Sequence, residues 1–153
     1  MPPVADTAAQ ARAIVDSNVY MTLATADADG RPWPSPVWFA HEDYARFVWV
    51  SKPQARHSLN VAARPQVGIV IFDSTAGPGE AAAVYVEGEA ARLEGQEEER
   101  GIAAFNRRSE ALGWPSWTVD DVRAPAAVRL YAATASTLFV LGPNDERIAV
   151  ELG

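Results

Sequence analysis

Residues 31–40 read Arg-Pro-Trp-Pro-Ser-Pro-Val-Trp-Phe-Ala, with proline at every second position from Pro32 to Pro36. In a β-strand, residues two apart point their backbone N–H groups toward the same edge. Proline has no N–H to donate, so one edge of this strand lacks three donors. We therefore expect the segment to form an open edge that faces solvent, a partner or a ligand, because it cannot lie fully paired inside a regular sheet.

The segments around residues 31–40 have the alternation that is typical of antiparallel strands. Residues 19–24 lead into a turn at 27–30, and residues 46–51 form the next strand of the predicted sheet. Further strands are predicted over residues 67–72, 82–93, 126–133, 137–141 and 147–152, with a bulge at Gly88, and helices over 6–17, 51–63 and 95–112. Because the strands come mostly as adjacent hairpins, we predict a mainly β fold. This fold is an antiparallel barrel of about seven strands with three peripheral helices, in one domain over residues 1–153.

The composition excludes several classes of function. The 153 residues contain no cysteine and only two histidines, His41 and His57, so thiolate ligands, cysteine nucleophiles and a histidine-rich site are excluded, and we predict no metal centre. His41 lies in a predicted turn, where we expect it to be exposed. A net charge of -7 opposes binding to nucleic acid or to anionic membranes. The longest apolar run, 67–72, is too short to cross a bilayer, and we expect a cytoplasmic protein.

One cluster of residues is suited to holding a small anion. The sequence Ser-Lys-Pro-Gln at 51–54 fits a capping box with Ser51 as the N-cap, so a helix is predicted to begin there. Free N–H groups at a helix start favour an anion, and Lys52, Arg56 and His57 add a charge and further donors. An ordinary capped helix with solvated side chains is the alternative interpretation of the same pattern.

Apolar and aromatic side chains are expected beside this cluster. Trp49 lies on the strand that leads into the predicted helix, and residues 36–39 place Pro, Val, Trp and Phe on the preceding strand. A flat heteroaromatic ring with a phosphate tail would suit such a site. The sequence contains no G-x-S-x-G elbow, no P-loop and no G-x-G-x-x-G. It therefore gives no support to a serine hydrolase or to the common nucleotide-binding folds.

Several short motifs occur in an order and spacing that resemble those of a known family. They are Leu23-Ala-Thr, Asp29-Gly-Arg-Pro32, Pro36-Val-Trp-Phe39, Val50-Ser51 followed by Arg56-His57 and Asn60, Arg64-Pro-Gln-Val67, and Val86-Glu-Gly-Glu-Ala90. Over roughly residues 18–133 the chain resembles the pyridoxamine 5'-phosphate oxidase-like, FMN-binding split β-barrel proteins. The compact length is similar to that of the flavin- and deazaflavin-dependent reductases in this group.

The resemblance implies a homodimer with two flavin sites at the subunit interface. It implies a site in which the strand with Ser35, Pro36, Val37 and Trp38 lines the isoalloxazine ring, Val50 and Ser51 contact the ring and ribityl chain, and Arg56 and His57 hold the phosphate, with Lys52 nearby. Two positions depart from the family pattern. The basic pair is usually Arg-Lys, and a polar residue that helps to bind flavin is Ala83 here.

The function implied is a flavin-dependent oxidoreductase that transfers a hydride between bound FMN and an unidentified small molecule. The flavin does the chemistry in such enzymes, so no catalytic side chain is assigned. Three alternatives stay open at this point. They are a reductase that uses the deazaflavin coenzyme F-420, a non-catalytic protein that stores flavin or haem, and an interaction module whose pocket binds no ring.

Overall fold

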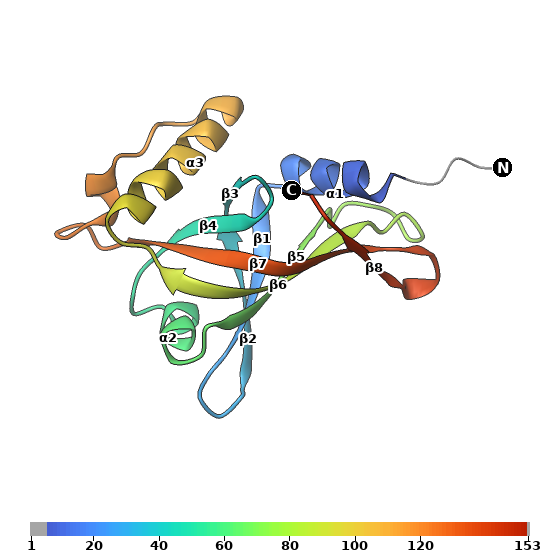
Figure 1. Cartoon of the computed structure of the whole chain (residues 1–153), viewed down its shortest axis with the longest axis horizontal. Helices are drawn as coiled ribbons and strands as arrows, with labels where there is room; N and C mark the ends of the chain where they lie inside the picture. Colours follow the sequence, from blue (N-terminus) through green and yellow to red (C-terminus); the bar gives the residue numbers. More distant parts are fainter. Residues whose placement is uncertain (1–5, 153) are drawn as a thin grey trace.

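In the part of the chain that the structure describes, eight strands form one antiparallel sheet and three helices lie around it (Figure 1). The computed structural model describes residues 6–152. The strands are β1 (Tyr20–Ala26), β2 (Pro32–Trp38), β3 (Ala40–Glu42), β4 (Arg46–Ser51), β5 (Gln66–Phe72), β6 (Ala83–Arg92), β7 (Arg129–Leu141) and β8 (Arg147–Val150). The helices are α1 (Thr7–Ser17), α2 (Arg56–Ala63) and α3 (Gln96–Leu112), with short 3-10 turns at Val119–Val122 and Pro143–Asp145. The strand order is β2-β1-β5-β6-β7-β4-β3, and β8 pairs with β7 outside this path. The predicted mainly β split-barrel architecture with three peripheral helices is confirmed.

The core lies on both faces of the central strands. In β4, Phe47 and Trp49 point into the main apolar cluster enclosed by the curved sheet and α1. Val48, between them, points to the other face and packs in a second cluster with Phe105 of α3. All four side chains are fully inaccessible to solvent. Because both faces of β4 are covered, the position of its last residue, Ser51, is fixed by the core.

Strand β2 is the edge strand that its prolines predict. It stands at one end of the strand order, and its only hydrogen-bonded neighbour within residues 6–152 is β1. In this register Thr22 lies opposite Pro36 and Leu23 lies opposite Ser35. The proline nitrogens therefore occupy the side that has no partner strand, where a missing donor leaves no ladder bond unmade.

The predicted bulge at Gly88 is confirmed. The register between β6 and β7 shifts between Glu87 and Gly88. A Cβ atom at Gly88 would lie 2.5 Å from the backbone oxygen of Thr134. The bulge allows β7 to continue across this point, so residues 126–133 and 137–141, predicted as two strands, belong to one long strand. The two-strand prediction was wrong because the polar segment between them pairs with β6 instead of turning.

Capping residues mark the ends of two helices. Asp6 caps α1 by accepting a hydrogen bond from the backbone N–H of Ala9 at 3.0 Å. Gly113 ends α3 with a left-handed backbone conformation, at φ 71°. Across residues 6–152, no helix has the length and apolarity needed to span a membrane.

Candidate functional site

The junction between β4 and α2 differs from its prediction in a way that matters for anion binding. Ser51 is the last residue of β4 and does not cap the helix. A turn follows, closed by the N–H of Ala55 donating to the carbonyl of Lys52 at 3.0 Å, and α2 begins only at Arg56. The prediction of a helix from residue 51 was wrong because the capping-box pattern is outcompeted by this turn.

The start of α2 has no side-chain cap. Its N-cap residue is Ala55, which has no side-chain acceptor, so the first N–H groups of the helix are left without a side-chain partner. The positive end of the helix dipole lies at the same place. A negatively charged group placed here would satisfy donors that the chain itself leaves unsatisfied.

His57, in the first turn of α2, reaches back to the end of β4. Its Nε2 lies 2.5 Å from Oγ of Ser51, and Ser51 is buried. Burial lowers the pKa of His57 below its ordinary value of 6.5, because desolvation disfavours the charged imidazolium. At neutral pH the ring is therefore mostly uncharged, and it serves the junction as a hydrogen-bonding group and not as a cation.

Arg56 is exposed and supplies the fixed positive charge at the helix start. Its guanidinium carbon lies 4.1 Å from the ring centroid of Trp33 in β2, which is a cation–π arrangement. Trp33 keeps 39% of its surface exposed. This contact brings the edge strand to the start of α2. Sequence reasoning did not select Trp33, although its place between two edge prolines was a usable signal.

Three hydrogen bonds, one of them buried, fix α2 against the β1–β2 hairpin. The side-chain amide of Asn60 donates to Oγ1 of Thr25 at 3.0 Å, and this hydroxyl donates to the carbonyl of Trp33 at 3.2 Å. Nearer the hairpin tip, Arg64 donates to the carbonyl of Ala28 at 2.9 Å. The separation of Arg56 from the edge strand is therefore set by the fold.

The residues predicted to line a ring fall on two faces of β2. Ser35 and Val37 are buried, and Val37 belongs to the main core cluster. Pro36 is exposed and Trp38 is half-buried on the opposite face. In β4, Val50 is partly buried against the second core cluster beside Trp38. The structure thus brings Ser51 and His57 into contact, but it places the side chain of Val37 away from the open surface.

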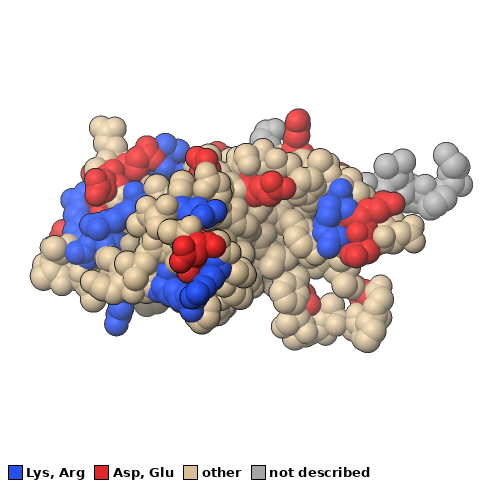
Figure 2. Space-filling model, turned by 90° about the horizontal axis from the view of Figure 1, so that it is seen from below, with Lys and Arg blue, Asp and Glu red and all other residues tan. Residues whose placement is uncertain are grey.

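Basic side chains are present at this end of the molecule, although the net charge is -7. Seen from below, most of the Lys and Arg side chains visible on this face lie on the half that carries α2 and α3, with Asp and Glu side chains among them (Figure 2). Lys52 is exposed in the turn that precedes α2. Arg56, Lys52 and the uncapped N–H groups form a donor set that fits a phosphate. The residues present at the junction therefore fit the tail of a phosphorylated ring cofactor.

The profile of the pyridoxamine 5'-phosphate oxidase family matches residues 7–141, which is most of the chain and includes the whole of this junction. The chain belongs to this family. No curated protein matches the sequence in a direct comparison.

Solved structures with the same fold have different recorded roles. A heme binding protein from Mycobacterium smegmatis shares 25% identity at a TM-score of 0.73; the match covers 98% of this chain and 59% of that one. HutZ, a heme storage protein from Vibrio cholerae, shares 23% identity at a TM-score of 0.67, covering 84% and 90%. An F-420 reductase shares 17% identity at a TM-score of 0.60, covering 84% and 94%. Haem-binding proteins and a reductase thus share the fold of this family member.

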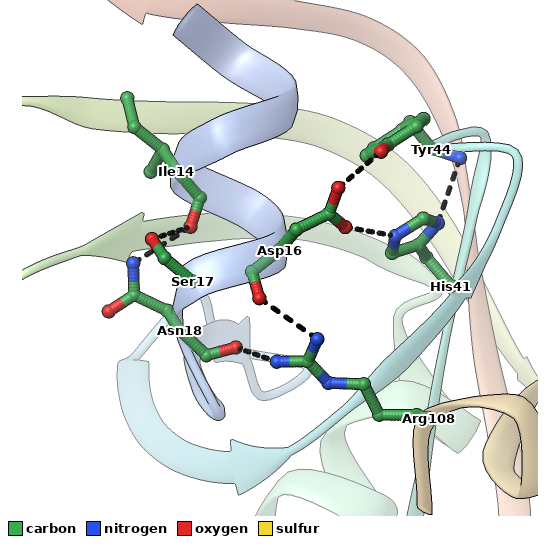
Figure 3. Close-up of polar contacts among 7 residues, drawn as sticks. All are labelled: Ile14, Asp16, Ser17, Asn18, His41, Tyr44 and Arg108. Atoms are coloured by element: carbon green, nitrogen blue, oxygen red, sulfur yellow. Dashed lines mark hydrogen bonds and ion pairs between the residues drawn. The ribbon is translucent and has the colours of Figure 1, made fainter. Parts of the chain in front are cut away.

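The second histidine lies outside the junction (Figure 3). Nε2 of His41 is 3.0 Å from Oδ1 of Asp16, and the backbone N–H of Tyr44 donates to its Nδ1 at 3.1 Å. The hydroxyl of Tyr44 donates to Oδ2 of Asp16 at 2.5 Å. The expectation that His41 is exposed was wrong, because these contacts attach the turn between β3 and β4 to the end of α1. Within the described part of the chain, no group of three or more His, Cys, Asp or Glu side chains is placed to hold a metal ion.

Proposed function

We propose that this family member is an FMN-binding oxidoreductase whose cofactor phosphate is held where β4 meets α2. One arrangement carries the proposal: the uncapped start of α2 has the exposed guanidinium of Arg56 on one side and the Ser51–His57 pair on the other. Backbone N–H groups and a guanidinium are the donors that most often bind phosphate in proteins.

Each residue of the junction has a distinct part in this proposal. Arg56 would donate charge-assisted hydrogen bonds to the phosphate from the edge of its guanidinium, while one face of this group lies over the ring of Trp33. Lys52 adds a point charge from the turn. Ser51 and the mostly neutral His57 orient each other, and they offer hydrogen bonds without adding to the positive charge of Arg56 and Lys52.

The ring of the cofactor is assigned to the surface beside β2 and the end of β4. The backbone of Ser35, Pro36, Val37 and Trp38 would border the ring there, because the side chains of Ser35 and Val37 are buried in the fold. Val50 precedes Ser51 on β4. Bound FMN would supply hydride transfer to or from a small molecule. The chain would position the ring, exclude water from one side of it and leave the other side open to that molecule.

A homodimer is part of the proposal. The outer face of the sheet carries apolar side chains, among them Val70, Phe72, Tyr85 and Phe139, and Phe72 keeps 47% of its surface exposed. A contiguous apolar face on a small protein is typical of an association surface. Light scattering at micromolar concentration is expected to give twice the chain mass, and a monomeric mass would contradict this part.

The test of the cofactor is a titration of ligand-free protein with FMN, riboflavin and the deazaflavin coenzyme, followed by visible absorbance. Riboflavin has the same ring as FMN without the phosphate, so the comparison isolates the junction. We expect saturable binding of FMN at least tenfold tighter than riboflavin. Equal affinities for FMN and riboflavin would contradict the proposal that the phosphate binds at the β4–α2 junction.

Two other results of this titration would favour a cofactor other than FMN. Tighter binding of the deazaflavin coenzyme would favour the reductase role that the F-420 reductase of the same fold carries by name. Binding of haem with no binding of either flavin would favour the role named for the Mycobacterium smegmatis and Vibrio cholerae proteins.

A further inference from the structure

Within residues 6–152, two arginines lie over aromatic rings, and they differ in what their N–H groups contact. The guanidinium carbon of Arg147 lies 4.4 Å from the ring centroid of Tyr85, and its Nη1 lies 3.0 Å from Oδ1 of Asp145. The guanidinium carbon of Arg56 lies 4.1 Å from the ring centroid of Trp33, but none of the ion pairs among these residues includes Arg56. The guanidinium of Arg56 is therefore held by one face, while its N–H edge has no carboxylate partner.

The acidic residue of the neighbouring hairpin, Asp27, is engaged within its own turn. Its Oδ1 accepts the backbone N–H groups of Asp29 and Arg31 at 2.9 and 3.0 Å. The hydrogen bond from Arg31 is the main reason that the pKa of Asp27 is lowered, and the charge of Arg56 contributes less. The carboxylate thus satisfies the hairpin turn, and the donors of Arg56 stay available to a ligand.

The ring of Trp33 is carried by a backbone with little freedom to move. Trp33 lies between Pro32 and Pro34 on β2, and each proline fixes its own φ angle. The carbonyl of Trp33 accepts a hydrogen bond from Oγ1 of Thr25 at 3.2 Å. The two prolines and this hydrogen bond set the backbone on both sides of the ring before any ligand binds.

The helix that carries Arg56 is bonded to the same part of the hairpin, which lies beside α2 in Figure 1. Asn60, one turn further along α2, donates from its side-chain amide to Oγ1 of Thr25 at 3.0 Å. Asn60 and Thr25 are buried, at 5% and 3% exposure. Because Thr25 in turn donates to Trp33, the contacts form a closed cycle that begins and ends at the guanidinium of Arg56.

Stacking on a ring and binding a phosphate use different parts of a guanidinium. The contact with the ring engages one face of the group, whereas the N–H donors lie in its plane and point outward. An arginine side chain has several rotatable bonds, and ordering them when a ligand binds costs entropy. A ring that already holds the guanidinium reduces this cost without competing for its donors.

We propose that Trp33 is a positioning residue of the phosphate site, whose ring holds the guanidinium of Arg56 in place with its N–H edge free for the cofactor phosphate. This role rests on the proposed function, because it needs a phosphate at the β4–α2 junction. Trp33 acts through Arg56 and does not itself contact the cofactor. Its loss should therefore weaken the binding of FMN and leave the binding of riboflavin unchanged.

The test compares the binding of FMN and riboflavin to the full chain, followed by visible absorbance, in the wild type, Trp33→Leu and Trp33→Phe. Leucine removes the aromatic face, whereas phenylalanine keeps one. We expect Trp33→Leu to raise the Kd of FMN about threefold to tenfold and Trp33→Phe to raise it about twofold or less, with no change for riboflavin. Equal losses for FMN and riboflavin in Trp33→Leu would mean that Trp33 contacts the flavin ring, and this would overturn the proposal.

A double-mutant cycle shows whether Trp33 acts through Arg56. Arg56→Ala alone and Arg56→Ala combined with Trp33→Leu are expected to bind FMN with the same affinity, because the ring then has no guanidinium to hold. A further loss in the double variant would show that Trp33 affects binding by another route, against the proposal. Leu59→Ala removes an exposed apolar side chain from another position on α2 and is the control, with FMN affinity expected to stay at the wild-type value.

The contact between the two side chains has a readout that needs no cofactor. Ring currents of an indole shift the NMR signals of protons over its face upfield, so the Hδ signals of Arg56 should be shifted in the wild type and return to ordinary values in Trp33→Leu. Absence of this shift in the wild type would overturn the proposal.

The outcomes for the proposed function and for Trp33 are distinguishable. Equal wild-type affinities for FMN and riboflavin would contradict the phosphate site itself, and the role of Trp33 would be refuted with it. A wild-type preference for FMN that Trp33→Leu leaves unchanged would refute the role of Trp33 alone and keep the phosphate at the junction. A preference that falls in Trp33→Leu and is restored in Trp33→Phe would support both.

Discussion

Ser51 and His57 join the end of a strand to the start of a helix through a 2.5 Å contact between Oγ and Nε2. Ser51 is held in β4 by pairing with Arg129 of β7, so the serine is anchored in the sheet. His57 follows Arg56 directly, and the contact therefore fixes the position of the helix start relative to the sheet. The anion-binding character of the junction depends on this link between two elements that are adjacent in the chain.

His57 is expected to make stability depend on pH. Burial sets its pKa in the folded protein below the 6.5 of the unfolded chain, so the unfolded state binds more protons in the window below about pH 6.5. The free energy of unfolding should fall as the pH drops through this window, and His57→Gln should reduce that fall. Urea unfolding at pH 8, 7, 6 and 5 measures both proteins. The same pH dependence in the two would mean that His57 titrates alike in both states.

Arg56→Ala is expected to weaken FMN binding by about 1–3 kcal/mol, because it removes charge-assisted hydrogen bonds to the phosphate. Riboflavin binding should change little, since riboflavin has no phosphate. Arg107→Ala removes the same charge from an exposed position on α3 and serves as the control. Parallel losses for FMN and riboflavin would indicate that Arg56 acts on the ring or on folding.

Gly88→Ala is expected to destabilise the protein by about 1–3 kcal/mol, because the added methyl group meets backbone atoms that cannot rotate away. The nearest of these is the oxygen of Thr134 at 2.5 Å. Gly68→Ala is the matched control on the neighbouring strand β5, where the new Cβ would meet only Cβ of Ala24 at 3.9 Å. Urea denaturation should show a neutral or slightly stabilising effect for Gly68. Equal effects at the two glycines would contradict the argument that the close approach of β7 at the bulge requires glycine at position 88.

Ser109→Ala is expected to raise the free energy of unfolding by about 1 kcal/mol, because it removes a buried hydroxyl that has no partner in residues 6–152. Ser17→Ala is the control in α1, where the hydroxyl donates to the carbonyl of Ile14 at 3.3 Å. Thermal unfolding of both variants measures the difference. Destabilisation by Ser109→Ala would show that the hydroxyl has a partner, such as an ordered water, in solution.

Tyr44→Phe removes a tyrosine whose pKa is raised well above the ordinary value of 10. Burial, the hydrogen bond to Asp16 and the charge of that carboxylate raise the pKa of Tyr44 to about 12. The ultraviolet absorbance of tyrosinate should therefore lose the step near pH 12 in the variant. Because the folded pKa exceeds the unfolded value of 10, the stability linked to Tyr44 is present below pH 10 and is lost between pH 10 and 12. At neutral pH we expect a loss of about 1 kcal/mol from the missing hydrogen bond.

The features that the sequence predicts well are those with a local cause. The three edge prolines, the bulge glycine and the strand β4 each follow from alternation or from the conformational limits of single residues. The start of α2 was mispredicted because the capping-box pattern at residues 51–54 competes with the turn closed by Lys52 and Ala55. Ser51 fits a capping box by its spacing, but in the fold its hydroxyl meets His57.

Other features of the structure depend on contacts between segments that are distant in the sequence. His41 meets Asp16 from 25 positions away, and Arg108 donates to the carbonyls of Asp16 and Asn18 across about 90 positions (Figure 3). A pocket between the end of β2 and α3 likewise combines Trp38 with Ser109 and Trp114. No periodicity or motif in a single sequence reports such contacts, because they arise only when the sheet brings its ends together.

The prolines of β2 have a consequence for how this protein behaves at high concentration. An unpaired strand edge is normally a template on which a strand from another molecule can add, and this is a common route to sheet growth and fibrils. Pro32, Pro34 and Pro36 leave carbonyl acceptors on that edge but no matching donors. A foreign strand therefore cannot complete a ladder along it. The edge can stay open to a ligand without becoming a point of aggregation.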